Sequence, residues 1–193
     1  MDHPRRLVLA SGSAYRKALL ERLGVPFEVA LPDVDETPLP AESPRDTALR
    51  LSVLKAKAVA ARGELIIGSD QVAAAGGQRY GKPGTHENAV RQLRELSGKA
   101  VDFHTAVTLL DTQSGRHESR LVPCRVLFRV LDERRIQTYL EREKPYDCSA
   151  AAKAEGLGIA LIARIDTEDP SALIGLPLIA LSEMLERAGL PVL

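Results

Sequence analysis

An acidic residue follows a short apolar run near the middle of the chain. The run Leu65-Ile66-Ile67 favours a buried strand. Gly68-Ser69 is expected to end this strand, so that Asp70 follows directly after the strand end. The ends of strands are where α/β proteins bind ligands and hold catalytic side chains. The sequence Gly81-Lys82-Pro83 follows a dozen positions later and places a positive charge on a stiff turn. A carboxylate and a lysine held in this way indicate phosphate chemistry with a divalent metal ion.

A second acidic group, Asp35-Glu36, lies in a loop bounded by prolines and precedes Thr37-Pro38. Acidic residues in loops usually face solvent. Together with Asp70, however, these residues would hold Mg²⁺, which prefers carboxylates, water and the phosphate oxygens of a substrate.

A basic group follows the small-residue turn Ser11-Gly12-Ser13. This turn joins an expected strand to an expected helix, and it would leave backbone N–H groups at the positive end of that helix. Arg16 and Lys17 lie in the first turn of the helix, where its dipole disfavours cations. Their presence there therefore needs an explanation other than helix stability. Binding of a polyphosphate is one such reason, and an ordinary capped helix with solvated basic residues is the other. The spacing is not that of a P-loop.

Further charged residues lie on other expected elements. Lys55 and Lys57 share a helix but point at different angles, so at most one of them can face a given site and the other is a solvated charge. Glu155 precedes a glycine turn, where it is either a surface acid or an acceptor of two hydrogen bonds from the edge of a base. The scattered histidines show no Ser-His-Asp order.

The elements that must position these residues alternate between strand and helix in the first half of the chain, and a hairpin follows. This order predicts an α/β fold with a mixed sheet. Strands are expected at 6–10, 27–31, from 65 onward, 101–110, 121–130 and 159–165, and helices at 14–23, 43–62, 85–96, 132–143 and 178–188.

Length and composition limit the classes of function. The 193 residues suit one domain, or two small lobes that share one core. The 26 basic and 26 acidic residues cancel, so no overall field favours nucleic acid or a membrane. Cys124 and Cys148 lack metal-ligand spacing and are expected to be reduced thiols of a cytoplasmic protein. The apolar run Leu7 to Ala10 is too short for a signal peptide or a membrane span.

Several motifs occur in an order and spacing that resemble the Maf family of nucleoside triphosphate pyrophosphatases. They are LASGSAYRKALLERLG, DVDET, IIGSDQV, GKP, LSGKAVDFHTAV and IGLPL, and they span nearly the whole chain. The resemblance implies one domain over residues 1–193, with a mixed twisted sheet flanked by helices and two lobes around a central cleft. It implies cleavage of a nucleoside triphosphate between its α and β phosphates, and it leads us to expect a homodimer.

The resemblance also implies roles for individual residues. Asp70 would be the general base for water or a ligand of the metal ion that activates it, and Glu36 would help to hold this Mg²⁺, Mn²⁺ or Co²⁺ ion. The residues expected to bind the phosphates are Ser11, Arg16, Lys55 and Lys82.

Three positions resemble the branch of the family that hydrolyses 7-methyl-GTP and so removes a modified nucleotide: Tyr15, Gln71 and Glu155. Methylation at N7 gives guanine a positive charge, which the face of an aromatic ring attracts. A carboxylate accepts hydrogen bonds from N1–H and the 2-amino group, whereas a pyrimidine would leave it poorly paired.

The sequence departs from the family pattern at three places. Ala14 stands where proline is usual, and Tyr15 stands where tryptophan is more usual. The segment Ser149-Ala150-Ala151-Ala152 replaces one that carries glycine and a large aromatic residue in close relatives. The first and third departures bear on the shape of the base pocket, and the second weakens stacking.

Other functions remain open at this point. One is a pyrophosphatase for dTTP, UTP or another modified nucleotide. Another is a regulator of cell division that binds a nucleotide without hydrolysing it, since the family has a historical link to septum formation. A nucleic-acid-binding protein is disfavoured by the neutral net charge and the few aromatic residues.

Overall fold

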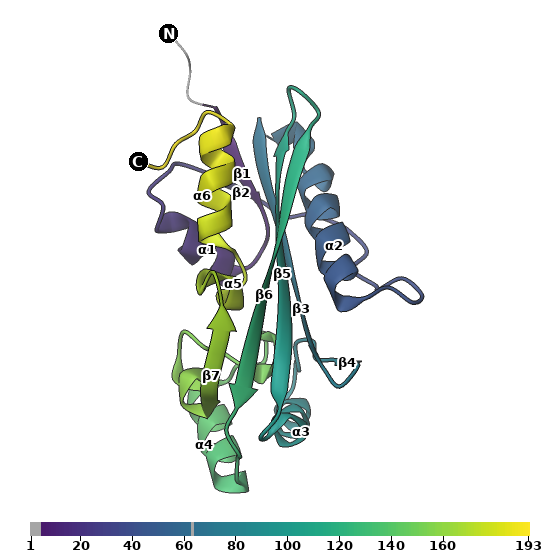
Figure 1. The fold of residues 1–193 in the computed structure, drawn as a ribbon, viewed down its shortest axis with the longest axis vertical. Helices are drawn as coiled ribbons and strands as arrows, with labels where there is room; N and C mark the ends of the chain where they lie inside the picture. The colour runs from purple at the N-terminus through teal and green to yellow at the C-terminus, as the bar shows by residue number, and fades with distance from the viewer. Residues whose placement is uncertain (1–4, 63) are drawn as a thin grey trace. The chain divides into compact units, whose positions relative to one another are not determined.

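The computed structural model describes residues 5–62 and 64–193, and its strands form one mixed sheet (Figure 1). The strand order is β2-β1-β3-β5-β6-β7, and β4 pairs with β3. The strands are β1 (Leu7–Ala10), β2 (Glu28–Ala30), β3 (Leu65–Ala75), β4 (Gln78–Arg79), β5 (Ala100–Asp111), β6 (His117–Phe128) and β7 (Ile162–Thr167). The helices are α1 (Ala14–Glu21), α2 (Pro44–Ala58), α3 (His86–Leu96), α4 (Glu133–Glu143), α5 (Ser171–Ile174) and α6 (Leu178–Arg187). Both predictions, an α/β fold and a mixed sheet, are confirmed.

The chain divides into two compact units, and the three long strands β3, β5 and β6 each contribute to both. The first unit comprises Met1–Asp70, Thr105–Val122 and Asp169–Leu193. The second comprises Gln71–His104 and Pro123–Glu168. On β3, the first unit ends at Asp70 and the second begins at Gln71.

The sheet of the first unit is covered by helices on both faces (Figure 1). In β1, which is parallel to β2 and β3, Leu7 and Leu9 pack with apolar residues of α1 and α6. Val8 and Ala10 point to the opposite face and pack with Ala56 of α2. A parallel strand buried on both faces is apolar at every position, which is why β1 has no polar alternation.

Strand β3 is longer than the sequence predicts. It does not end at Gly68-Ser69 but continues through Asp70 to Ala75, so Asp70 lies within the strand and the prediction of a strand end was wrong. Gly68 has another role, because a Cβ atom there would lie 2.0 Å from the backbone oxygen of Ser52 on α2. The glycine permits close approach of helix and strand rather than ending the strand.

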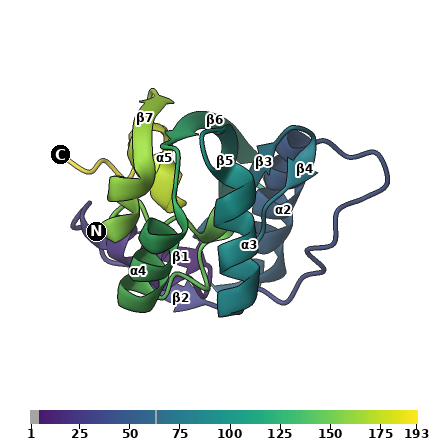
Figure 2. The same cartoon turned by 90° about the horizontal axis from the view of Figure 1, so that it is seen from below.

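The second unit contains β4, α3, α4 and β7, together with parts of the long strands. A two-residue turn, Gly76-Gly77, joins β3 to β4, and both glycines have positive φ angles of 56° and 83°. Two such angles are what a type I′ hairpin turn requires. Helices α3 and α4 lie side by side (Figure 2) and are joined by an ion pair between Arg94 and Glu133.

Most helix starts agree with the sequence. Ser13, Ser43, Thr85 and Asp132 each cap a helix with the side chain, as an N-cap residue should.

The late strand was misplaced: residues 157–161 form a 3₁₀ helix, and β7 begins only at Ile162. The short helix α5 was not predicted. Within the described part of the chain, no helix has the length and apolar character needed to cross a membrane.

Candidate functional site

Lys55 lies between two carboxylates in the first unit. Its Nζ atom is 2.7 Å from Oδ1 of Asp70 and 2.8 Å from Oε1 of Glu36. Lys55 projects from α2 and its side chain is only 6% exposed, whereas Lys57 is exposed. The structure therefore brings together three residues that lie far apart in the sequence, and it confirms that only one of the two lysines faces inward.

Asp70 is a nearly buried acid on β3. Burial raises the pKa of Asp70, and the negative charge of Glu36 acts in the same direction. The positive charges of Lys55 and Arg16 oppose this rise in pKa. An acid whose pKa is raised by burial has a stronger tendency to take up a proton, which is the property that a general base needs.

Arg16 has a clear reason to lie in the first turn of α1. Its Nε atom donates to the backbone oxygen of Gly175 at 2.8 Å, and Nη1 donates to Oγ of Ser11 at 3.4 Å. Burial lowers the pKa of Arg16, and the charges of Asp70 and Glu36 oppose this effect. The guanidinium group thus belongs to the same cluster of charges as Lys55. Its hydrogen bonds and the two nearby negative charges compensate for the unfavourable interaction of a cation with the start of a helix.

The backbone oxygen of Gly175 is a shared anchor that the sequence did not reveal. It accepts hydrogen bonds from Arg16 and, at 2.9 Å, from Oγ of Ser69, the residue before Asp70. The φ angle of Gly175 is 120°, a region open to glycine. Gly175 belongs to the motif IGLPL, which was the only feature of the sequence that pointed to this position.

The turn at Ser11 offers fewer backbone donors than expected. The amide of Ser11 donates to the oxygen of Leu9, and the amide of Ser13 donates to Oγ of Ser11. The amide of Arg16 donates to Oγ of Ser13. These three groups are therefore engaged within the chain, and the side chains of Ser11 and Arg16 remain as the groups predicted to bind phosphate.

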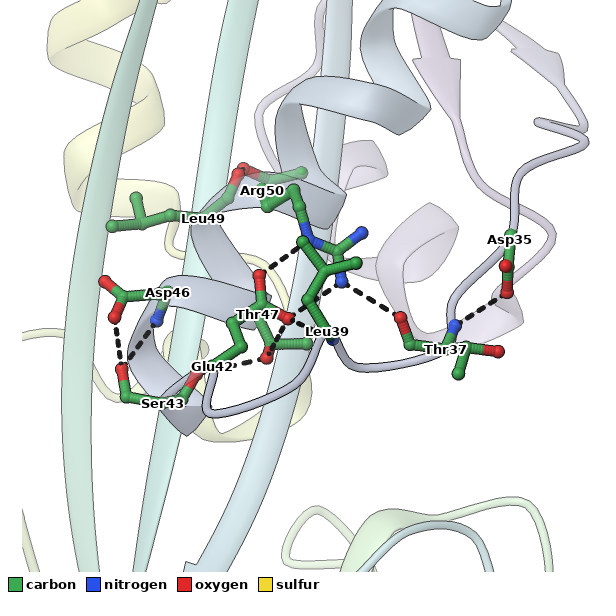
Figure 3. A network of polar contacts seen from close by, with 10 residues as sticks. Asp35, Thr37, Leu39, Glu42, Ser43, Asp46, Thr47, Leu49 and Arg50 are labelled. Atoms are coloured by element: carbon green, nitrogen blue, oxygen red, sulfur yellow. Dashed lines mark hydrogen bonds and ion pairs between the residues drawn. The ribbon is translucent and has the colours of Figure 1, made fainter.

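The loop that carries Glu36 is attached to α2 by a polar network (Figure 3). Arg50 of α2 donates two hydrogen bonds to the carboxylate of Glu42, at 2.6 and 2.9 Å, and a third at 3.1 Å to the backbone oxygen of Thr37. Sequence reasoning missed Glu42, in the loop before α2, and Arg50, in the middle of α2, because charged residues at such positions usually face solvent.

Of the other predicted residues, Tyr15 lies half-buried in the first turn of α1 in the first unit, and Gln71, Lys82 and Glu155 lie in the second unit. Lys82 is exposed, and the backbone on both sides of it is held: the oxygen of Gly81 accepts from Gln92 at 3.1 Å, and the oxygen of Pro83 accepts from Asn88 at 3.0 Å. These bonds agree with the predicted stiff turn. The lysine that contacts Asp70 is Lys55 of the first unit.

Glu155 lies on a loop that is organised by Glu143 of α4. One oxygen of Glu143 is 2.7 Å from Nζ of Lys153, and the other accepts from the amide of Leu157 at 2.6 Å. The hydrogen bond from Lys153 lowers the pKa of Glu143. A Cβ atom at Gly156 would lie 2.6 Å from this carboxylate, which explains the glycine after Glu155. The carboxylate of Glu155 itself is exposed.

A metal ion would find oxygen ligands of a suitable kind beside Lys55. Among the residues that the structure describes, no group of three or more His, Cys, Asp or Glu side chains is gathered for a metal ion. Mg²⁺ is usually bound through one or two carboxylates, with water and substrate phosphates completing its shell. Asp70 and Glu36 already direct one oxygen each to a cationic ammonium group, so their chemistry fits such an ion.

The chain is similar in sequence to known proteins over nearly its whole length. The 7-methyl-GTP pyrophosphatase of Thiobacillus denitrificans is 56% identical over 189 residues, which cover 97% of this chain and 94% of that protein. The proteins of the same name from Nitrosospira multiformis and Burkholderia pseudomallei are each 54% identical over 97% of this chain, and the aligned regions cover 96% and 90% of those proteins.

A family model described as Maf-like protein matches residues 6–188, which include all the residues of the candidate site. The chain belongs to the Maf family.

Proposed function

We propose that this protein hydrolyses 7-methyl-GTP to 7-methyl-GMP and diphosphate, and thereby removes a modified nucleotide. The observation that carries the proposal is the 54–56% identity, over nearly the whole chain, to relatives named 7-methyl-GTP pyrophosphatase. The contacts of Lys55 with Asp70 and Glu36, and the charge of Arg16 nearby, support it, because phosphoryl transfer needs fixed positive charges and a group that accepts a proton.

In the proposed reaction, water attacks the α-phosphorus and the bond from this atom to the bridging oxygen of the β-phosphate breaks. The diphosphate leaves with that oxygen. The attacking water gives up one proton, and we assign Asp70 as the group that accepts it. The raised pKa of Asp70 agrees with this role.

Cationic groups would neutralise the charge that develops on the phosphates. We assign this role to Arg16, Lys55 and Lys82, and we assign the positioning of the triphosphate to Ser11. Lys55 is nearly buried and paired with Asp70, so its ammonium group would be in place before the substrate binds.

Glu36 would hold a divalent cation, Mg²⁺, Mn²⁺ or Co²⁺, and Asp70 would be its second ligand if the Asp70→Asn variant described below excludes it as the base. When bound, such an ion supplies Lewis-acid stabilisation of phosphate charge and lowers the pKa of a bound water molecule.

Recognition of the base is assigned to Tyr15, Gln71 and Glu155. The positive charge of 7-methylguanine favours an aromatic face and a carboxylate partner. Replacing Glu155 by Gln and Gln71 by Thr should shift preference from 7-methyl-GTP toward dTTP and UTP. An unchanged preference in this double variant would show that the base is recognised elsewhere.

We place the protein in the cytoplasm as a homodimer. The reduced thiols of Cys124 and Cys148 agree with that compartment. The dimer is an expectation taken from the family.

A substrate screen tests the proposal. The wild-type protein is incubated with 7-methyl-GTP, GTP, dTTP or UTP and a divalent metal ion, and the products are separated by chromatography. We expect the highest kcat/KM for 7-methyl-GTP. A preference for dTTP or UTP would instead indicate the other branch, and binding without turnover would indicate a regulator.

The variant Asp70→Asn then tests the assigned base. Asparagine keeps an oxygen ligand but cannot accept the proton. We expect lost turnover at every metal concentration, with substrate binding largely retained. Recovery of turnover at high metal concentration would show instead that Asp70 acts as a metal ligand, and turnover at the wild-type rate would exclude Asp70 from both roles.

A further inference from the structure

The acidic loop between β2 and α2 carries Glu36 but is attached only weakly at that residue. The side chain of Glu36 is 60% exposed, although it contacts the buried ammonium group of Lys55. Ion pairs of exposed side chains contribute little to stability, because solvent screens the charges and each side chain loses rotamer freedom. The contact between Glu36 and Lys55 is therefore insufficient by itself to hold a long loop in one place.

A stronger attachment lies a few residues along the loop (Figure 3). Arg50 and Glu42 form a two-bond pair, with Nε to Oε1 at 2.6 Å and Nη2 to Oε2 at 2.9 Å. Their side chains are 23% and 9% exposed. Paired, parallel hydrogen bonds between guanidinium and carboxylate groups are both strong and specific in geometry.

Glu42 in turn gathers the end of the loop around its carboxylate. Oε2 of Glu42 accepts a hydrogen bond from the amide of Leu39 at 3.0 Å and another from Oγ1 of Thr47 at 2.8 Å. The hydrogen bond from Arg50 lowers the pKa of Glu42 to about 2, so this carboxylate is charged at neutral pH.

Arg50 also reaches the residue next to Glu36. Its Nη2 atom donates to the backbone oxygen of Thr37 at 3.1 Å, while the amide of Thr37 donates to Oδ1 of Asp35 at 2.9 Å. Arg50 and Lys55 both project from α2. One rigid helix thus supplies both the lysine that contacts Glu36 and the arginine that fixes the backbone beside it.

We propose that Arg50 and Glu42 are positioning residues that hold Glu36 in place against Lys55 for its role at the metal ion. The inference rests on the proposed function only where it assigns Glu36 to the metal ion; the attachment of the loop by Arg50 does not depend on it. Lysine at position 50 would keep the charge but could not form the two-bond pair and also reach Thr37, because its ammonium group is a single point rather than a planar fork.

The experiment is a double-mutant cycle of Arg50→Lys and Glu36→Gln, with hydrolysis measured against metal concentration. Because residues that orient a metal ligand typically change metal affinity by about 10–100-fold, Arg50→Lys should raise the half-saturating Mg²⁺ concentration at least tenfold. If Arg50 acts through Glu36, adding Arg50→Lys to Glu36→Gln should cause no further change. Independent effects that multiply in the double variant would overturn the proposal.

Hydrogen exchange supplies a readout besides activity. In Arg50→Lys, the peptide that covers residues 33–42 should lose protection of its amides, including those of Thr37 and Leu39. Unchanged protection in this peptide would overturn the proposal, even if activity fell. Glu42→Gln, which loses the charge but keeps the size, should reproduce both effects, and it serves as the second variant if Arg50→Lys does not fold.

The chain offers a matched control in the second unit. Arg94 and Glu133 form a similar two-bond pair, at 2.9 and 2.7 Å, that joins α3 to α4. Arg94→Lys should leave both the metal dependence and the exchange of residues 33–42 unchanged. An equal response to Arg94→Lys would show that loss of any such pair is sufficient, and it would contradict a local role for Arg50.

Failure of the proposed function would look different from failure of this inference. If the wild-type protein prefers another triphosphate, the cycle is measured with that substrate. If it hydrolyses none, the proposed function is wrong, and the exchange of residues 33–42 still decides whether Arg50 holds the loop.

Discussion

The Nζ atom of Lys55 lies 2.7 Å from Oδ1 of Asp70, and both side chains are at least 90% buried. A buried ion pair of this kind gains little stability over an apolar pair, yet the loss of one partner leaves an uncompensated charge. Lys55 therefore favours the ionised form of Asp70, and loss of Lys55 would leave the buried carboxylate without its nearest positive charge.

Replacing Lys55 by Met should destabilise the protein by about 3 kcal/mol and abolish hydrolysis, because Asp70 then loses its nearest counter-charge. Urea unfolding followed by circular dichroism measures the first effect. The variant Lys57→Met is the control, since Lys57 is exposed, and it should retain both stability and activity. Equal stabilities of the two variants would contradict the structural role given to Lys55.

A methyl group at Gly68 should be poorly tolerated. In Gly68→Ala the new Cβ atom would meet the backbone of Ser52 at 2.0 Å, which requires α2 to move away from β3. We expect a loss of about 3 kcal/mol or more in the free energy of unfolding. Gly12→Ala is the matched control, because its Cβ atom would meet only the flexible side chain of Leu31, at 2.9 Å. Similar losses in both variants would show that helix and strand are not closely packed at Gly68.

The residues Ala150 and Ala151 have positive φ angles of 57° and 51°, in a segment where close relatives were expected to carry glycine. Left-handed backbone costs an L-residue roughly 1–2 kcal/mol. Ala150→Gly should therefore raise the free energy of unfolding by up to about 1 kcal/mol, once the greater chain entropy of glycine and the loss of a buried methyl group are deducted. Ala152→Gly, at a φ angle of −107°, should be neutral or destabilising. A destabilised Ala150→Gly variant would contradict the strain inferred here.

The Glu42–Arg50 pair predicts a contribution to stability that depends on pH. The pKa of Glu42 is about 2 in the folded protein and about 4.5 in the unfolded chain. A lowered folded-state pKa gives stability that is fully present above the unfolded value and is lost as the pH falls toward 2. The wild-type free energy of unfolding should therefore fall more steeply between pH 5 and pH 2 than that of Glu42→Gln. Parallel pH profiles would show that Glu42 is not paired in solution.

Much of the fold follows from local patterns in the sequence. The apolar run Leu7 to Ala10 and the capping residues Ser43 and Thr85 placed their elements correctly, because burial on both faces and side-chain capping are local effects. The end of β3 was misplaced because a glycine required by a neighbouring helix has the same local pattern as one that ends a strand.

The candidate site was predictable to a similar degree. The sequence predicted site roles for Glu36, Lys55 and Asp70, and in the structure Lys55 contacts both acids. Arg50 and the backbone oxygen of Gly175 were missed. The role of Gly175 depends on a contact with Arg16, which lies 159 positions away. The role of Arg50 depends on how an irregular loop folds back onto α2 at Glu42 and Thr37, and its residue type does not indicate this from the sequence alone.

Hydrolysis of 7-methyl-GTP in ¹⁸O-labelled water tests the central claim most directly, since the label marks the phosphorus atom that water attacks. The account predicts one labelled oxygen in 7-methyl-GMP and none in diphosphate. Label in diphosphate, or release of inorganic phosphate from the wild-type protein, would contradict it.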